Sequence, residues 1–424
     1  IHTFHSLGLA ILRDHPAAAG LQRDFAVASE GERAAMLVDA MGVAPAKAEA
    51  LLRTISKAKR QQGPMSVETA HVLEIYAQAL SVRNWIDFDD CVGLALRALS
   101  DHPELARDYR ARFRFVSVDE FQDIDEPQYR LIAQLAPPPA NLCVIGDPDQ
   151  AIYGFRGADA SCFARLRRDY GPQEIRLQRN YRSSGTIVAA SAQVIASADV
   201  IASADAAASA IVRAMHERIT IHAAPTERAE AEFVVQTIER LIGGHSFFSI
   251  DTGRAGRTNT SLSFSDFAVL YRTDAQSAPL VEAMTRSGIP FRKNGQNVLD
   301  PDDRIAADAT ATAAQGEHVA LLTLHAAKGL EFRVVFVVGL EDGILPLRFG
   351  AEEGSAEERR LFYVGMTRAE DHLILTRAQQ RLWRGKVQSL PPSPFLQDIE
   401  SALLQVQHHD ARRRKPQDRQ LSLF

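Results

Sequence analysis

The sequence predicts an α/β protein with parallel sheets flanked by helices and a largely helical region near its beginning. Short apolar runs typical of strands alternate with stretches of helical periodicity, and this order favours parallel sheets. Acidic residues directly follow two of these runs, at the strand ends where parallel sheets bind ligands. With 424 residues, 46% of them hydrophobic, the chain is long enough for two to four domains.

Helical periodicity dominates the first hundred residues. Ala, Leu, Arg and Glu are abundant over Leu7–Leu99, and apolar residues recur three and four positions apart, as at Ala35, Met36, Val38 and Met41. We expect a helical subdomain here.

Two strands with acidic ends follow. Phe113–Val118 is rich in aromatic and β-branched residues and runs into Asp119 and Glu120. A helix is expected over Gln128–Leu135, ending before three prolines. The continuous apolar run Leu142–Ile145 predicts a strand buried on both faces, which ends at Gly146 and Asp147.

The later half has the same α/β character. The Ala/Ser-rich stretch Ala189–Ala210 contains a short repeat and predicts a plain helix. His245–Ser263 is rich in Gly, Thr and Ser and predicts an exposed loop. Strands are expected at Phe267–Tyr271, Val319–His325 and Val334–Leu340, and they indicate a second α/β domain.

The composition is that of an ordinary cytoplasmic protein. A net charge of −5 excludes a histone-like polycation. Cys91, Cys143 and Cys162 form no CxxC pair, so we expect neither a disulfide framework nor a cysteine zinc site. No apolar run reaches membrane-spanning length, and the first ten residues lack the layout of a signal peptide. The polar tail from His408 should be disordered.

The acidic strand ends are candidates for phosphate chemistry. Of the adjacent carboxylates Asp119 and Glu120, one can hold Mg²⁺ through water while the other orients or deprotonates a water, although a solvated turn or helix cap is the competing interpretation. After the next strand, Gln150 is a candidate polar sensor. Tyr153 and Phe155 would share one face of an extended segment and could stack on bases, or they could simply pack in a core.

In the order of these segments and of those that follow, the chain resembles the UvrD/Rep/PcrA group of superfamily 1A DNA helicases. The motifs that carry the resemblance lie between residues 3 and 369, and the resemblance covers nearly all of the chain up to about Ile399. The matching segments are Thr3–Ser6 (motif Ib), Val118–Asp123, Gly146–Ala158, Leu177–Ser184 (motif IV), Leu322–Phe332 (motif V) and Glu358–Ala369 (motif VI).

The resemblance implies roles for individual residues in ATP binding and hydrolysis. Asp119 and Glu120 would bind Mg²⁺, with Glu120 also the catalytic base, and Gln150 would sense the γ-phosphate. Arg182 and Arg368 would supply arginine-finger charges, with surface salt bridges as the competing role, and Glu331 would bind the ribose of ATP.

A second group of residues would contact DNA by the same resemblance. Phe155 stands where the family usually has Trp, which puts base affinity at that step in doubt, and His325 could instead be an ordinary core histidine. The implied DNA contacts are Thr3, Phe4, His5, Tyr153, Phe155, Arg156, His325 and Lys328.

The implied protein is an ATP-dependent 3′ to 5′ helicase or translocase of DNA repair or replication, associated with the bacterial nucleoid. Its partners would be single-stranded DNA and junctions of single and double strands. Its implied parts are an incomplete RecA-like domain 1A (1–8 and 86–176), a helical subdomain 1B (9–85), a RecA-like domain 2A (177–291 and 320–400), a vestigial 2B (292–319) and a disordered tail (401–424).

The chain departs from the family pattern in two ways. No Gly-x-x-x-x-Gly-Lys-Ser/Thr segment is present, and we expect it to lie upstream of Ile1, so that the chain as given hydrolyses ATP poorly or not at all. Only residues 292–319 are available for the usually large 2B subdomain.

The last five residues form an addition. Gln420, Leu421, Ser422, Leu423 and Phe424 resemble the pentapeptide that binds the bacterial sliding clamp, although an apolar end packing on its own domain is the alternative. The alternative to the helicase is a non-catalytic scaffold that binds single-stranded DNA and the clamp. A helicase–nuclease fusion finds no support in the tail, which is too short for a nuclease domain.

Overall fold

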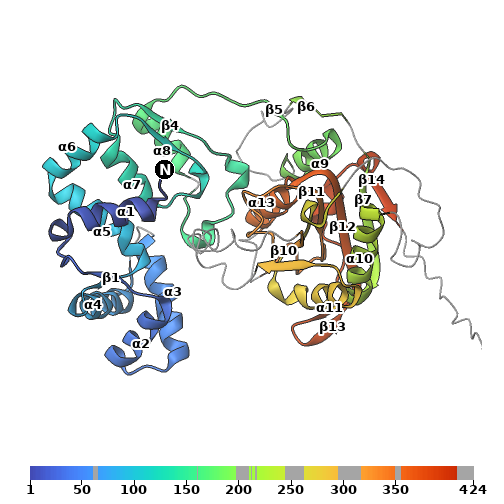
Figure 1. The fold of residues 1–424 in the computed structure, drawn as a ribbon, viewed down its shortest axis with the longest axis horizontal. Coiled ribbons are helices and arrows are strands. Elements are labelled where there is room, and N and C mark those ends of the chain that lie inside the picture. Colours follow the sequence, from blue (N-terminus) through green and yellow to red (C-terminus); the bar gives the residue numbers. More distant parts are fainter. Residues whose placement is uncertain are drawn as a thin grey trace, which may run out of the picture. The chain divides into compact units, whose positions relative to one another are not determined.

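The computed structural model consists of two compact units, Ile1–Ile175 and Arg176–Phe424 (Figure 1). Residues 245–261 of the loop predicted at His245–Ser263 and the tail from His408 lie outside the described residues. No helix in the described part is long and apolar enough to cross a bilayer. The residues that the structure describes are 1–60, 65–159, 161–196, 210–211, 213–214, 217–243, 262–294, 317–348 and 355–407.

The first unit is mainly helical, as its early sequence predicts. Its helices are α1 (Phe4–Asp14), α2 (Glu30–Met41), α3 (Pro45–Arg60), α4 (Val67–Val82), α5 (Phe88–Asp101), α6 (Pro103–Arg112), α7 (Glu126–Leu135) and α8 (Cys162–Tyr170). Its strands form the parallel pairs β1 (Ala26–Val27) with β2 (Trp85–Ile86) and β3 (Val116–Val118) with β4 (Leu142–Val144). Its 3₁₀ turns are η1 (Pro16–Ala19), η2 (Phe121–Asp123), η3 (Pro148–Gln150) and η4 (Gly154–Arg156).

Helices α2, α3 and α4 form a cluster of their own at one end of this unit (Figure 1). Ser29 caps α2 through a reciprocal bond with Glu32, and Gly42 ends the helix in the left-handed conformation. The apolar faces of the three helices meet around Leu37, Leu52 and Tyr76. A second core joins α1, α5, α6 and α7.

A buried ion network ties α3 to the start of α5. Lys59 Nζ lies 2.8 Å from Asp87 Oδ2 and 2.7 Å from Asp90 Oδ1, and the Tyr76 hydroxyl donates to Asp87 at 2.8 Å. Burial, together with the adjacent Asp87 charge, raises the pKa of Asp90 to about 6. Burial alone would also raise the pKa of Asp87, but the Lys59 charge and the hydrogen bonds from Lys59, Asp90 and Tyr76 together hold that pKa below its usual value. Breaking one partner would leave a charge buried without compensation.

The pair β3–β4 is covered on one face only. Val118 is buried against a core that includes Phe121 and Tyr129. In contrast, Cys143 is exposed and Ile145 is 53% exposed. The prediction that Leu142–Ile145 is buried on both faces is therefore wrong. Parallel sheets are normally covered on both sides, but within the described residues nothing packs on this second face.

The second unit is built on a parallel sheet. Its strands follow the order β14-β7-β12-β11-β8-β10-β9, all neighbours are parallel, and β13 forms an antiparallel hairpin with β12. The strands of the sheet are β7 (Ile219–Thr226), β8 (Phe267–Tyr271), β9 (Phe291–Asn294), β10 (Val319–Thr323), β11 (Phe332–Val337), β12 (Ala369–Trp383), β13 (Lys386–Gln388) and β14 (Leu404–Gln407), and β5 (Arg179–Asn180) pairs separately with β6 (Ala210–Ile211). The fold class is thus confirmed, and β8 has the predicted bounds.

Helices cover both faces of this sheet (Figure 1). Phe267, Val269 and Tyr271 of β8 point into the core formed with α10 and α11, whereas Leu270 faces Gly365 of α13 on the other side. The alternation explains why β8 is apolar throughout. The helices are α9 (Gly185–Ala196), α10 (Glu227–Gly243), α11 (Ser277–Ser287) and α13 (Ser355–Met366), and the 3₁₀ turns are η6 (Phe264–Asp266), η7 (Asp274–Gln276), η8 (Pro394–Asp398) and η9 (Ser401–Leu403).

Candidate functional site

Two acidic segments of the first unit meet at one edge of the β3–β4 pair. Val118 and Val144 are paired at the carboxyl ends of the two strands, so Asp119 and Glu120 leave the sheet beside Asp147. Asp119 and Glu120 are both exposed. The parallel pairing thus brings together carboxylates that are 27 or more positions apart in the sequence.

The Glu120 backbone adopts the left-handed conformation, with φ of 52°. This conformation costs a non-glycine residue free energy. Such residues keep it only where the surrounding structure imposes it. The Gln122 side-chain amide Nε2 donates a hydrogen bond to Glu120 Oε2, and Gln122 itself is only 2% exposed. The carboxylate is therefore held from the interior side of the turn.

The loop after β4 continues the same set of bonds. Gln122 Oε1 accepts the Asp147 backbone N–H at 2.9 Å, and Asp147 Oδ2 accepts Gln150 Nε2 at 2.7 Å. Space is tight here, because a Cβ on Gly146 would lie 2.7 Å from Gln122 Oε1 and 2.9 Å from the Phe163 ring. The structure therefore joins Glu120 and Gln150 through Asp147, an acidic strand end that the sequence pointed to, and through Gln122, which was not predicted as a site residue.

The aromatic segment follows at η4 (Gly154–Arg156). The expectation of an extended segment is wrong, because the chain forms a 3₁₀ turn that ends at Gly157 with φ of 100°. The Tyr153 and Phe155 rings still lie near each other, with centroids 6.2 Å apart, and the Arg156 guanidinium lies over both. Phe155 is 55% exposed, so an aromatic face remains open to a ligand.

Thr3, Phe4 and His5 begin α1. Thr3 caps the helix by accepting the Ser6 N–H at 3.1 Å, and Phe4 packs on the apolar cores. The His5 ring stacks on Phe88 at 3.8 Å, and burial, aided by the Arg60 charge, lowers the pKa of His5 to about 3. His5 is thus neutral at physiological pH and has no charge to offer a phosphate.

In the second unit, Arg182 and Glu331 form an ion pair, with Arg182 Nε 2.8 Å from Glu331 Oε2. Both side chains are exposed to solvent. Ser183 Oγ donates to the Ala369 carbonyl at 2.6 Å, which fixes this loop at the start of β12. Glu331 itself directly precedes β11, so the pair lies at the amino edge of the sheet.

Arg368 lies at the same edge but is 2% exposed. Its guanidinium donates to the Val364 carbonyl at 3.0 Å, the Leu330 carbonyl at 3.2 Å and Thr367 Oγ1 at 3.1 Å. Of the two predicted arginine fingers, Arg182 is the one exposed in this conformation.

Another arginine supports the Arg182 loop. Arg213 donates to the Arg182 carbonyl and forms an ion pair with Asp371, which also binds Arg333 at 2.9 Å. Burial alone would raise the pKa of Asp371, but the two guanidinium groups outweigh it and lower that pKa. Tyr181, next to Arg182, is 67% exposed. Neither Arg213 nor Tyr181 was predicted as a site residue from the sequence, although Tyr181 falls within the motif IV segment.

The remaining predicted contacts are buried or outside the described residues. His325 is 8% exposed and Lys328 is 4% exposed. The structure thus keeps both away from solvent in this conformation. The clamp-binding candidates Gln420, Leu421, Leu423 and Phe424 lie outside the described part of the chain.

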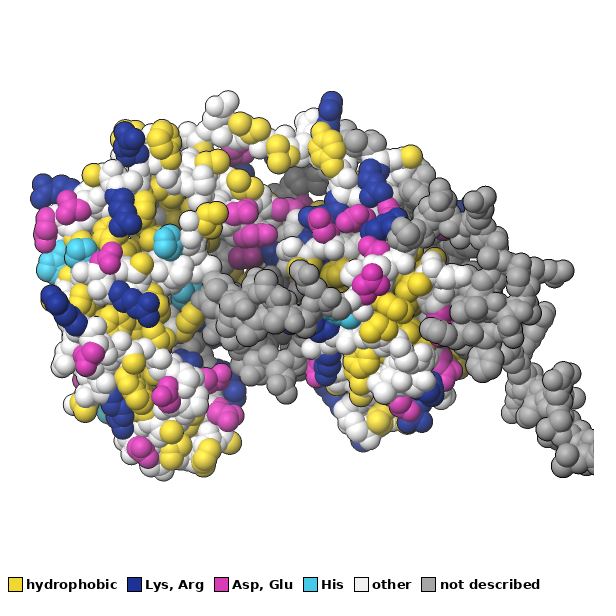
Figure 2. All heavy atoms as spheres, in the orientation of Figure 1, with side chains coloured by type: hydrophobic (Ala, Val, Ile, Leu, Met, Phe, Trp, Pro, Cys, Tyr) yellow, Lys and Arg dark blue, Asp and Glu magenta, His cyan; other side chains and the backbone are white. Residues whose placement is uncertain are grey.

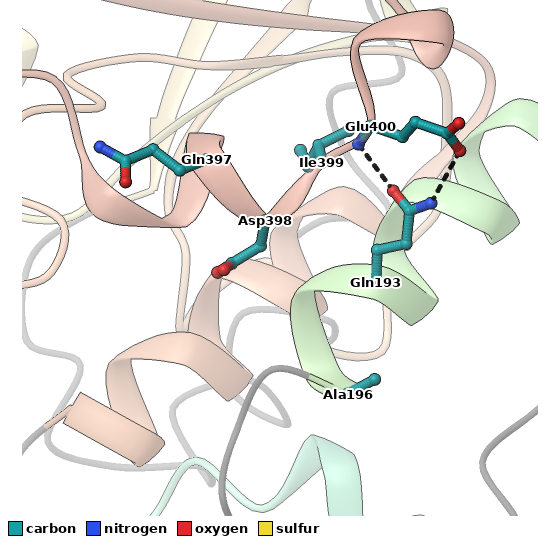
Figure 3. Close-up of a pocket in the computed structure, with 6 residues that line it drawn as sticks. All are labelled: Gln193, Ala196, Gln397, Asp398, Ile399 and Glu400. Atoms are coloured by element: carbon teal, nitrogen blue, oxygen red, sulfur yellow. Dashed lines mark hydrogen bonds between the residues drawn. The ribbon is translucent and has the colours of Figure 1, made fainter.

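Neither unit gathers its basic side chains into one continuous surface on the face shown in Figure 2. A shallow pocket lies between α9 and residues 397–400, where Gln193 Oε1 accepts the Glu400 N–H at 2.9 Å (Figure 3). It includes Ala196, the last residue of α9, whereas Arg182 precedes the first turn of that helix. The pocket is therefore separate from the Arg182 pair by the length of α9.

Comparisons with known proteins cover nearly the whole chain. Residues 1–171 match the UvrD/REP helicase N-terminal domain, and residues 175–299 and 304–380 match the UvrD-like helicase C-terminal domain. The ATP-dependent DNA helicase PcrA of Leuconostoc citreum is 25% identical, with 99% of this chain and 77% of the relative covered. PcrA of Staphylococcus aureus strain MRSA252 is 26% identical (95% and 76% covered), and UvrD1 of Mycobacterium bovis is 26% identical (95% and 75%). With both domain models matched in order along most of its length, the chain belongs to the UvrD-like family of DNA helicases.

Proposed function

We propose that the protein is an ATP-dependent helicase or translocase that moves 3′ to 5′ along single-stranded DNA in bacterial DNA repair or replication, at the nucleoid. The observation that carries the proposal is the linked set Glu120, Gln122, Asp147 and Gln150 at the carboxyl edge of β3–β4. It joins an acid–base candidate to a polar sensor, as coupling between hydrolysis and movement requires.

In this proposal the two units contribute opposite charges to one reaction. Glu120 accepts a proton from the attacking water, and Gln150 contacts the γ-phosphate. Arg182 then supplies a positive charge to the transition state, and Arg368 supplies a second positive charge. For this role the Arg368 guanidinium has to give up its present hydrogen bonds to three oxygens. Since phosphoryl transfer depends mainly on positioning and charge stabilisation, hydrolysis would depend on the two units closing on ATP.

The acidic edge also fits Mg²⁺. The described residues contain no group of three or more ligands that could hold a metal alone. Mg²⁺, however, usually takes one or two carboxylates and completes its shell with waters and phosphate oxygens. Asp119 and Glu120 are exposed oxygen donors of this kind. When bound, the ion would neutralise charge on the phosphates.

The nucleotide site would include two more side chains. Glu331 would accept a hydrogen bond from the ribose, and its present bond to Arg182 would have to be exchanged for one to the nucleotide. Tyr181 presents an exposed ring beside them, which suits stacking on a base.

Single-stranded DNA would lie on the aromatic turn. Tyr153 and Phe155 offer ring faces to bases, and Arg156 adds a cation above the rings. Thr3, Phe4, His5, His325 and Lys328 are weaker candidates, because the first three support α1 and the last two are buried. We propose that these five residues shape the protein backbone around the bound DNA strand.

Two further parts of the proposal concern domains and partners. We propose the division 1–8 and 86–176 (1A), 9–85 (1B), 177–291 and 320–400 (2A) and a vestigial 2B at 292–319, of which 292–294 belong to β9. The alignment with the Leuconostoc relative has 595 positions against 424 residues here, at least 171 more, which supports a deletion.

The pentapeptide Gln420–Phe424 would bind the bacterial sliding clamp, and unchanged clamp affinity after its deletion would refute this.

The alternative function is a non-catalytic scaffold that binds single-stranded DNA and the clamp. DNA-stimulated ATPase activity and directional translocation, measured on the natural full-length polypeptide with Glu120→Gln as control, separate the two. Tight DNA binding without ATP turnover would favour the scaffold.

A further inference from the structure

Both ends of the Gln122 side-chain amide are used, and the side chain is buried. Its Nε2 donates to the Glu120 carboxylate, and its Oε1 accepts the backbone N–H of Asp147 at 2.9 Å. Only 2% of the residue is exposed. A buried amide with both ends bonded is restricted to one orientation.

We propose that Gln122 is a positioning residue that fixes the Glu120 carboxylate relative to the loop that carries Gln150. The inference rests on the proposed role of Glu120 as base. Gln122 touches neither substrate nor DNA in this proposal, and acts only through Glu120 and Asp147.

The geometry gives Gln122 this task for two reasons. Glu120 is exposed, and its backbone lies in the left-handed region. The hydrogen bond from Nε2 restricts its carboxylate. The second bond anchors the amide to the Asp147 backbone, and the Asp147 side chain accepts Gln150 Nε2. A shift of Gln150 on ligand binding would therefore be transmitted to the base through three hydrogen bonds.

Glutamine is the residue type that fits, because the position needs one donor and one acceptor on the same planar group. Glutamate keeps the acceptor for the Asp147 N–H and replaces the donor by a second carboxylate facing Glu120. Methionine keeps the length of the side chain and removes both bonds. The two variants therefore separate support of the loop from control of the base.

The first measurement is hydrogen exchange at the Asp147 amide in the natural full-length polypeptide. Loss of a neutral hydrogen bond worth about 1 kcal/mol should speed exchange roughly five- to tenfold in Gln122→Met, whereas Gln122→Glu should stay close to wild type. Unchanged exchange in Gln122→Met would overturn the link to the loop.

The second measurement is steady-state ATP turnover of the same variants with saturating single-stranded DNA. In Gln122→Glu, kcat and kcat/KM should fall together by about 10²-fold, as expected for a reacting group displaced by about 1 Å. A purely structural role predicts wild-type turnover in Gln122→Glu, because the loop keeps its bond, and that result would overturn the proposal.

Two controls separate this inference from the proposed function. Gln134→Met removes a glutamine side chain from α7 of the same unit, where it bonds Arg110 at 3.2 Å, and should leave turnover unchanged. Glu120→Gln tests the base itself. If Glu120→Gln still turns over ATP, the proposed role of Glu120 fails; if it is inactive while Gln122→Glu is fully active, only the positioning role fails.

Discussion

The two units present their candidate residues at opposite ends of their strands. In the first, Asp119, Glu120 and Asp147 follow the carboxyl ends of β3 and β4. In the second, Glu331 and Arg368 precede the amino ends of β11 and β12. The usual rule for parallel sheets locates the first group and misses the second. The position of a residue relative to the strand ends therefore predicts the acidic residues of the first unit but not the charged residues of the second.

Removing positive charge from the second unit should have the largest effect on turnover. Arg182→Ala is expected to lower kcat for ATP by at least about 10³-fold, the range measured for arginine fingers, with single-stranded DNA affinity retained. Arg182→Lys should restore little, because a point charge does not replace the planar fork. Turnover within a few-fold of wild type would mean that this edge plays no catalytic part.

Removing the base from the first unit tests the other side of the comparison. Glu120→Gln keeps the size of the side chain and abolishes its capacity to accept a proton, so kcat should fall by about 10²- to 10⁴-fold. The variant should still bind ATP and DNA, as measured by equilibrium titration. Asp274→Asn, far along the chain on an exposed turn, is the matched control and should have normal turnover.

The aromatic turn should have a more modest effect, confined to DNA. Phe155→Ala removes an exposed ring and should weaken single-stranded DNA binding by roughly 1–3 kcal/mol, whereas Phe155→Trp should strengthen it. Fluorescence titration with an oligonucleotide at fixed salt checks this. Equal affinities for the Ala and Trp variants would show that bases do not stack here.

The last prediction concerns the stability of the first unit and its dependence on Asp125, the N-cap residue of α7. Burial, opposed by a bond from Gln128, raises the pKa of Asp125 to about 6, above its unfolded value near 4. The stability due to the neutral form is complete below pH 4 and is lost as pH rises through 6. Asparagine caps helices equally well, so Asp125→Asn should stabilise the protein by about 2 kcal/mol at pH 8 and little at pH 4. A pH-independent difference in unfolding free energy would contradict this.

Sequence patterns located the strands and the charged residues of the site, and missed the bonds between them. The apolar run Phe267–Tyr271 is a complete strand because both of its faces are covered, and periodicity detects such runs. Leu142–Ile145 has the same pattern but one open face, since coverage depends on other elements. Gln122 went unnoticed because only the parallel pairing of β3 and β4 brings it to Asp147, 25 positions away.

Gly146 gives this site an evolutionary constraint. Any side chain at position 146 would have a Cβ 2.7 Å from the Gln122 amide oxygen and 2.9 Å from the Phe163 ring. A larger residue there would displace the amide that holds Glu120. We therefore expect positions 146 and 122 to change together during divergence. A relative with a larger residue at the first and no amide at the second would mark a lineage in which Glu120 is no longer held by this bond.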